Sequence, residues 1–156
     1  MIYVLDTSAI GVLSNYYPAT FGTLWGLIEA MADEGTFVSV REVLNELENW
    51  SASDFIQDWA RRRRALFATP SPAEQAAVAR ILAVPHFQQI IGTQAMLKGT
   101  PVADPFVIAA AMVAGGAVVT QEKLKPNAAK IPNVCAHFGV PYCDVEGFMR
   151  QQGWVF

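Results

Sequence analysis

The stretch that decides the fold opens the chain and reads Ile2-Tyr3-Val4-Leu5-Asp6-Thr7-Ser8. Its apolar residues run without alternation, and Ile2 and Val4 are β-branched. Such a run predicts a strand buried on both faces, as in the middle of a parallel sheet. Asp6 follows at the carboxyl end of this strand, where open α/β sheets bind their ligands. We therefore expect the rest of the chain to bring further functional side chains to Asp6.

Outward from this strand, apolar runs alternate with helical patterns. The runs typical of buried strands cover residues 36–40, 117–120 and 140–143. The helical patterns cover residues 9–14, 21–34, 41–49, 51–67, 72–84, 87–97, 105–114, 132–138 and 145–152. Alternating strands and helices indicate βαβ units and a parallel sheet. We predict one α/β domain over residues 1–156, with the first strand central and helices on both faces.

Composition narrows the class of protein. With 53% hydrophobic and 16% charged residues, the 156-residue chain should fold as one ordered domain. We expect a cytoplasmic protein, since no apolar run reaches the length of a membrane span and the N-terminus lacks the features of a signal peptide. The cysteines and histidines do not have zinc-ligand spacing. The net charge of the chain is −3. If four acids belong to a metal pocket, the rest of the chain is slightly positive, so the net charge does not exclude a polyanionic substrate.

Four acidic residues follow or adjoin predicted strands. Asp6 and Glu122 each come just after a strand, Glu46 lies in the helix after the second strand, and Asp104 begins a buried helix. Because the carboxyl ends of parallel strands meet at one edge, we expect the four carboxylates in one pocket. Clustered carboxylates repel unless cations neutralise them, and Mg²⁺ prefers oxygen ligands. The site suits metal-assisted hydrolysis of a phosphodiester.

Each acid also has a structural interpretation. Asp104 precedes Pro105 and is an ideal N-cap, Asp6 could cap the helix that follows it, with Ser8 as another candidate cap, and Glu122 could be an exposed turn residue. The second acid is open among Glu42, Glu46 and Glu48, and we prefer Glu46. The hydroxyl residues could hydrogen-bond the carboxylates or simply end strands; they are Thr7, Ser8 and Thr120.

Basic residues offer candidate phosphate contacts. Lys123, Lys125 and Lys130 lie on the loop after the fourth acid and are the better placed. The run of arginines at 61–64 is another candidate. For that run we favour a solvated helix face paired with nearby aspartates.

In these motifs the chain resembles the PIN domain superfamily. Residues 3–8 resemble its opening motif, and residues 38–47, ending Asn45-Glu46-Leu47, resemble the second. Residues 102–110 resemble the third motif, and Val118-Val119-Thr120-Gln121-Glu122 resembles the fourth. The segments 16–25 and 130–135 are similar to a bacterial and archaeal PIN-like branch of unassigned function related to the VapC toxins.

The resemblance implies a three-layer α/β/α fold and an Mg²⁺- or Mn²⁺-dependent endoribonuclease. Asp6, Glu46, Asp104 and Glu122 then match the catalytic and metal-binding acids. It also implies the toxin of a type II toxin–antitoxin pair, neutralised by a small antitoxin protein, and often a homodimer. The fourth acid is Glu rather than the commoner Asp, so its reach differs.

The sequence is also compatible with other functions. The chain could be a catalytically weak PIN-like domain that serves as a binding or scaffold module. Phosphatase chemistry of the haloacid-dehalogenase type is the weaker alternative, because Ser8 stands where that chemistry needs a second Asp. The tryptophans at 25, 50, 59 and 154 suggest a surface covered by a second copy or an antitoxin. Burial within one chain is the competing explanation for them.

Overall fold

The strands form one parallel sheet with the first strand in the middle. The computed structural model describes residues 1–49, 53–92 and 102–156, and the strand order of its five-stranded sheet is β3-β2-β1-β4-β5. The strands are β1 (Tyr3–Leu5), β2 (Phe37–Val40), β3 (Phe67–Ala68), β4 (Ala117–Val119) and β5 (Tyr142–Cys143). The predicted α/β class and the central first strand are confirmed.

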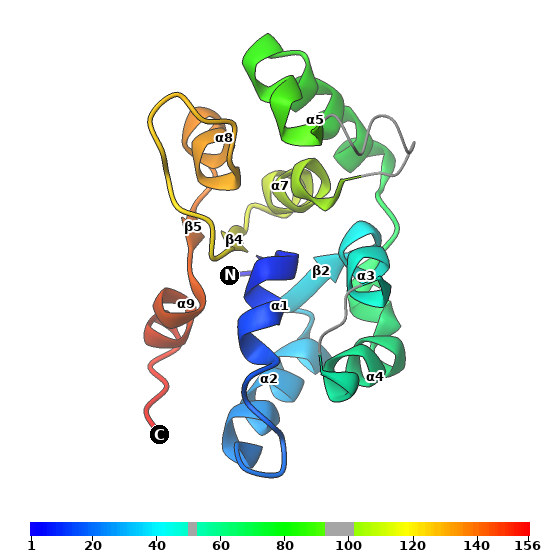
Figure 1. Cartoon of the computed structure of the whole chain (residues 1–156), viewed down its shortest axis with the longest axis vertical. Helices are drawn as coiled ribbons and strands as arrows, with labels where there is room; N and C mark the ends of the chain where they lie inside the picture. Colours follow the sequence, from blue (N-terminus) through cyan, green and yellow to red (C-terminus); the bar gives the residue numbers. More distant parts are fainter. Residues whose placement is uncertain (50–52, 93–101) are drawn as a thin grey trace.

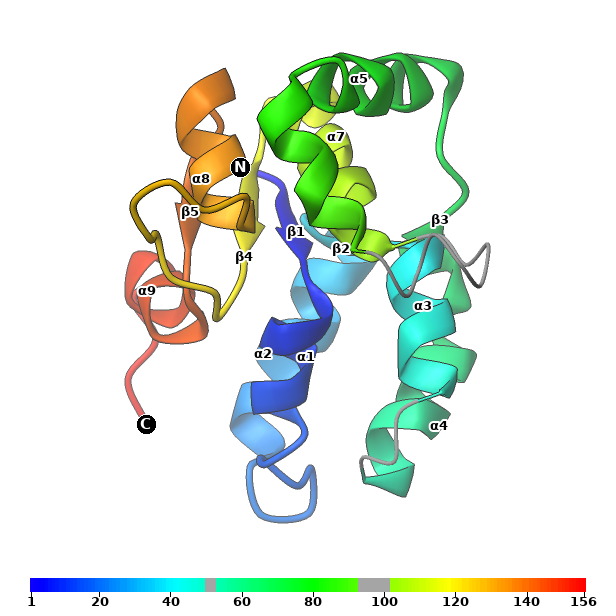
Figure 2. The same cartoon turned by 45° about the horizontal axis from the view of Figure 1, so that its top comes forward.

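Helices cover both faces of the sheet and complete a three-layer α/β/α arrangement (Figures 1 and 2). On one face, α7 packs against β1, β2 and β4 and is flanked by α5 and α8, whereas α2, α4 and α9 lie on the other face. The α-helices are α1 (Thr7–Leu13), α2 (Gly22–Glu34), α3 (Arg41–Glu48), α4 (Asp54–Arg62), α5 (Pro72–Leu82), α7 (Ala103–Ala114), α8 (Ile131–Phe138) and α9 (Val145–Gln151). Two 3-10 helices are η1 (Arg64–Leu66) and η2 (Pro85–Ile91). Among the described residues, no helix is long and apolar enough to cross a bilayer.

Aromatic side chains fill the core on the face of α2, α4 and α9. Tyr3 and Phe37 are register neighbours, so their side chains share this face. The ring of Phe148 in α9 lies 4.9 Å from that of Tyr3 and 6.0 Å from that of Phe37. Trp59 of α4 packs against Phe37 from the other side, with ring centroids 6.3 Å apart.

The tryptophans are largely explained by this core. Trp25 and Trp59 are buried within the chain, and Trp154 is partly buried against Phe148, with ring centroids 5.4 Å apart. Trp50 lies outside the described residues. Burial in the monomer therefore accounts for Trp25 and Trp59.

The strand order reverses at β1, and this reversal positions the site. The chain runs from β1 outward to β2 and β3 and then returns to β4 on the other side of β1. The amide of Ala117 donates to the carbonyl oxygen of Ile2 at 2.9 Å. A Cβ added to Gly116 would overlap that carbonyl oxygen, so glycine permits this close approach. Ligands of such sheets bind in the crevice outside the carboxyl ends of the strands at the reversal.

Two local predictions need correction. β3 lies inside the segment predicted as a helix over residues 51–67; α4 ends at Arg62 and a strand of two residues closes the segment. A strand this short shows no alternation that sequence can display. The helix predicted over residues 87–97 is a 3-10 helix over the described residues 85–91, and its remainder lies outside the described residues.

Two further helices begin at residues whose side chains cap them. Ser71 caps α5 by accepting from the amide of Glu74 at 3.1 Å, with Pro72 in the first turn. Asp144 caps α9 by accepting from the amide of Gly147 at 2.8 Å.

Candidate active site

A pocket of about 390 Å³ opens at the carboxyl edge of the sheet, beside β1. Four segments that are distant in sequence each contribute one carboxylate to it. These segments are the residue after β1, the α3 helix, the first turn of α7 and the turn after β4. The lining residues are Asp6, Thr7, Ser8, Gly11, Glu46, Asp104 and Glu122. The structure thus brings the four predicted acids together, while their chemical roles stay predictions.

Asp6 is buried and held in place by three donors. It is the N-cap of α1, and its Oδ1 accepts from the amide of Thr7 at 2.7 Å. Its Oδ2 accepts from Ser8 Oγ at 2.7 Å and from Thr120 Oγ1 at 3.0 Å. The cap is therefore Asp6, whereas Ser8 lies inside α1. These bonds fix the orientation of the carboxylate at the mouth of the crevice.

Glu46 links α3 to the start of α7. Its Oε1 accepts from the amide of Ala103 at 3.2 Å, and its Oε2 accepts from Thr7 Oγ1. Glu42 is instead buried outside the pocket and paired with Arg41 at 2.9 Å, and Glu48 is exposed. Of the three glutamates of α3, Glu46 is the one in the pocket lining.

Glu122 joins β4 to α8. Its Oε2 accepts from the amide of Ile131, the first residue of α8, at 2.9 Å. Its own amide donates to Thr120 Oγ1 at 3.2 Å, and Thr120 in turn donates to Asp6. Glu122 is half-buried rather than an exposed turn residue.

Asp104 differs from the other acids in lacking a donor. The N-cap of α7 is Val102, so Asp104 lies in the first turn instead of capping the helix. Its carboxylate makes no hydrogen bond within the described ranges 1–49, 53–92 and 102–156. Burial, and then the negative charges of Asp6, Glu122 and Glu46, raise the pKa of Asp104 to about 8, with Lys130 acting in the opposite direction.

The donor chemistry of the pocket fits a hard divalent cation. Four carboxylates share one cavity. Burial and then the charges of the other three raise the pKa of Asp104, and a cation would favour its ionised form again. In the described part of the chain, no three His, Cys, Asp or Glu side chains are grouped closely enough to hold an ion directly. Mg²⁺ typically takes one or two carboxylates and fills its shell with water and phosphate oxygens. The pocket offers four carboxylates for those one or two positions.

The predicted lysines separate into distinct environments. Lys130 lines an adjoining cavity together with Asp104 and Glu122. Lys123 pairs with Asp144 at 3.0 Å and lines a further cavity that also contains Glu122. Lys125 is exposed and lines none of these three cavities. Lys130 is therefore the lysine best placed for a phosphate near the acids.

In the arginine run at 61–64, the interpretation as a solvated helix face paired with nearby aspartates holds for Arg62, whereas the partly buried Arg63 pairs with acids of α2. Arg62 pairs with Asp58 at 3.3 Å. Arg63 pairs with Asp33 at 2.8 Å and with Glu29 at 3.3 Å. Arg63 therefore links the C-terminal end of α4 to α2.

Residues 3–156 match the family described as a domain of unknown function, DUF4411. This chain belongs to the DUF4411 family. The match includes every strand of the sheet and every acid of the pocket. No curated protein matches the chain.

Sequence reasoning missed two kinds of residue around the site of this DUF4411 chain. Gly11 lines the pocket one helical turn after Thr7, a spacing that could have indicated it. Gln89 and Ile90 line the cavity next to the acids. Sequence carries no sign of them, because they lie in η2, which belongs to none of the acidic segments.

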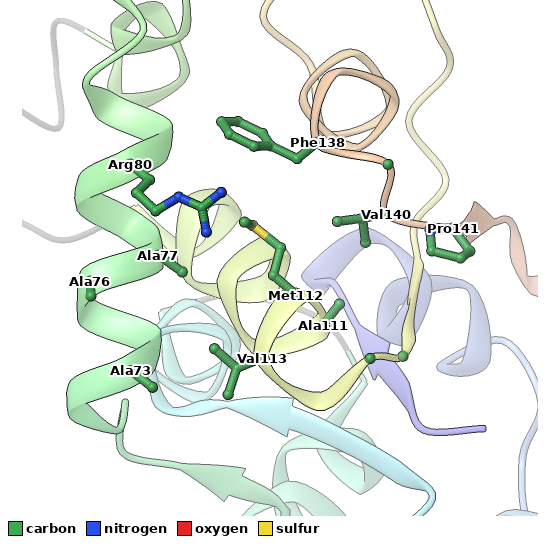
Figure 3. A pocket seen from close by; sticks show the side chains of 13 residues that line it. Ala73, Ala76, Ala77, Arg80, Ala111, Met112, Val113, Phe138, Val140 and Pro141 are labelled. Atoms are coloured by element: carbon green, nitrogen blue, oxygen red, sulfur yellow. The ribbon is translucent and has the colours of Figure 1, made fainter.

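A larger cavity of this DUF4411 chain, of about 540 Å³, lies away from the acids (Figure 3). It is lined by residues that precede β4 and β5, such as Gly116 and Pro141, so it is at the amino edge of the sheet. Its wall is mostly apolar, with Arg80 reaching in from α5 at 5.8 Å from the ring centroid of Phe138. No carboxylate lines it, so the metal chemistry considered above belongs to the smaller pocket.

Proposed function

We propose that this protein is a metal-dependent ribonuclease that hydrolyses RNA phosphodiester bonds. The observation that carries the proposal is the convergence of four acids from four separate segments in one pocket at the strand-order reversal. The raised pKa of Asp104 supports it, because burial and then the negative charges of the other three acids disfavour its ionised form, and a cation would favour that form again. The resemblance of the acidic motifs to PIN ribonucleases supports the same chemistry.

Asp6 and Asp104 would hold Mg²⁺ or Mn²⁺, with Glu46 and Glu122 acting as ligands through water. Such an ion polarises the phosphoryl group and lowers the pKa of bound water. Ser8 and Thr120 orient Asp6, and Thr7 orients Glu46. Lys130 supplies positive charge for a phosphate oxygen beside these acids.

Cleavage of labelled RNA tests the proposal. The purified protein should cleave with Mn²⁺ or Mg²⁺ and stop when a chelator is added. Asp104→Asn should reduce cleavage by about 100-fold or more, equivalent to a few kcal/mol of transition-state stabilisation. Glu48→Gln is the matched control, because Glu48 is an exposed acid on the same helix as Glu46. Cleavage that persists in chelator, or that survives in Asp104→Asn, would refute the proposal.

The second candidate function is a binding or scaffold module. The observation that favours it is that Asp6, Glu46 and Glu122 already accept hydrogen bonds from protein donors. A module of this kind would bind RNA equally with metal and with chelator and would leave the RNA intact. The cleavage experiment therefore separates the two candidates.

For the biological role, we propose the toxin of a type II toxin–antitoxin pair, acting in the cytoplasm as a homodimer neutralised by a small antitoxin. Val155 and Phe156 are exposed apolar residues, and such residues suit a partner surface. Induced expression of the wild-type chain should arrest growth, and Asp104→Asn should not. Light scattering of the purified protein should give the mass of a dimer. Normal growth with a fully active ribonuclease would exclude the toxin role.

A further inference from the structure

A second cavity, of about 330 Å³, adjoins the carboxylate pocket. The two cavities share Asp104 and Glu122 as common wall. The other lining residues come from η2 and from the loop before α8, and they are Gln89, Ile90, Ala128, Ala129 and Lys130. A molecule bound to the acids would therefore lie next to this cavity, with Asp104 and Glu122 in contact with both spaces.

Two contacts hold the walls of this cavity against each other. His86 Nε2, in η2, lies 3.3 Å from the carbonyl oxygen of Ala128 and is within hydrogen-bonding distance. Phe87, the next residue, is buried with its ring 5.1 Å from that of His137 in α8. On the side of the acids, the amide of Ile131 donates to Glu122. The cavity is thus formed by segments joined to each other and to the site.

The lining combines the chemical features that bind a nucleotide. Gln89 is exposed, and its side-chain amide makes no hydrogen bond within the described part of the chain, so one donor group and one acceptor are available. Ile90, Ala128 and Ala129 provide small apolar surface for the face of a base. Lys130 provides a cation next to the acids. Unstacked RNA bases are recognised by such edge contacts and apolar packing.

We infer that this cavity is a nucleoside subsite, in which Gln89 reads the edge of the base next to the scissile phosphate and Lys130 contacts that phosphate. The inference rests on the proposed nuclease function and adds a specificity-determining residue to it. An amide matches the donor and acceptor pair that adenine presents at N6 and N7, whereas guanine presents two acceptors at the corresponding edge. The subsite therefore favours adenine over guanine.

Binding of AMP and GMP, each alone and with Mg²⁺, tests the subsite without requiring turnover. The wild-type protein should bind AMP about five- to tenfold more tightly than GMP, within the range expected of one bidentate base contact. Gln89→Leu should reduce that ratio to about one while leaving the melting temperature unchanged. Gln88→Leu is the matched control, because Gln88 is the exposed neighbour and its amide donates to the carbonyl of Leu82.

The outcomes distinguish the subsite from the nuclease proposal. An AMP-to-GMP ratio that is the same in Gln89→Leu and wild type, or absent binding of both nucleotides to wild type, would overturn the subsite. RNA cleavage that prefers sites flanked by adenine, with the preference lost in Gln89→Leu and kept in Gln88→Leu, would support it. Discriminating binding without any RNA cleavage would count against the nuclease function and leave the base contact of Gln89 standing.

Discussion

At the scale of single residues, Asp104 and Asp6 line the same pocket but differ in the hydrogen bonds that their carboxylates accept. Asp6 accepts three hydrogen bonds, whereas Asp104 accepts none from the described residues and is surrounded by like charges. Asp104→Asn should therefore stabilise the metal-free protein at pH 9 by at least about 1.4 kcal/mol, the value of one pKa unit, since the pKa shift spans several units. Asp6→Asn should bring no gain, because the amide nitrogen that replaces one carboxylate oxygen cannot accept a hydrogen bond, so the donors on Oδ1 and Oδ2 can no longer all be satisfied. Thermal melts in chelator compare the variants, and equal stabilisation by both would contradict this assignment.

The same residue predicts a pH dependence of unusual sign. The pKa of Asp104 is raised in the folded state from 3.8 to about 8, so between these values the folded protein binds more protons than the unfolded one. The free energy of unfolding that Asp104 contributes should fall as the pH rises from about 4 to about 8 and then level off. Denaturant unfolding of wild type and Asp104→Asn in chelator measures this as a difference curve. A difference that is constant across this pH range would refute the shift.

At the scale of elements, the contact between β1 and β4 depends on one glycine. A Cβ at Gly116 would meet the backbone carbonyl of Ile2, which cannot move without disturbing the central strand. Gly116→Ala should therefore destabilise the fold by about 1–3 kcal/mol, as overpacking does. Gly26→Ala is the control, because Gly26 lies exposed inside α2 with open space around its Cα. That change should stabilise the protein by about 0.5–1 kcal/mol, and destabilisation of similar size at both positions would exclude the steric explanation.

At the scale of the whole molecule, a cation would connect four segments that the chain brings together only by folding. Because the unfolded chain lacks this pocket, Mn²⁺ at about 100 times its dissociation constant should stabilise wild type by about 2.7 kcal/mol. For a protein of this size the melting temperature should rise by about 5–10 °C. The rise should be smaller in Asp104→Asn and absent with a monovalent salt of equal ionic strength. Equal metal-induced shifts in melting temperature in both proteins would show that Asp104 is not a metal ligand.

Sequence by itself determined the class of fold and the edge of the sheet that carries the acids. Continuous apolar runs at residues 2–5 and 117–119 indicate burial on both faces, which a parallel sheet covered by helices provides. An acid directly after such a strand must then lie at the carboxyl edge, so Asp6 and Glu122 were predictable as neighbours. The two-residue strand β3 was not predictable, because so short an element has no periodicity.

Only the tertiary structure decided which residues complete the site. Glu42 and Glu46 share a helix face at a spacing of four residues, so periodicity cannot separate them. The packing of α3 against the start of α7 places Glu46 beside Ala103 and leaves Glu42 buried with Arg41. Gln89 likewise reaches the acids only through the docking of η2 against the loop before α8. Sequence patterns record which face of an element is buried, whereas the rotation and contact of packed elements depend on the whole fold.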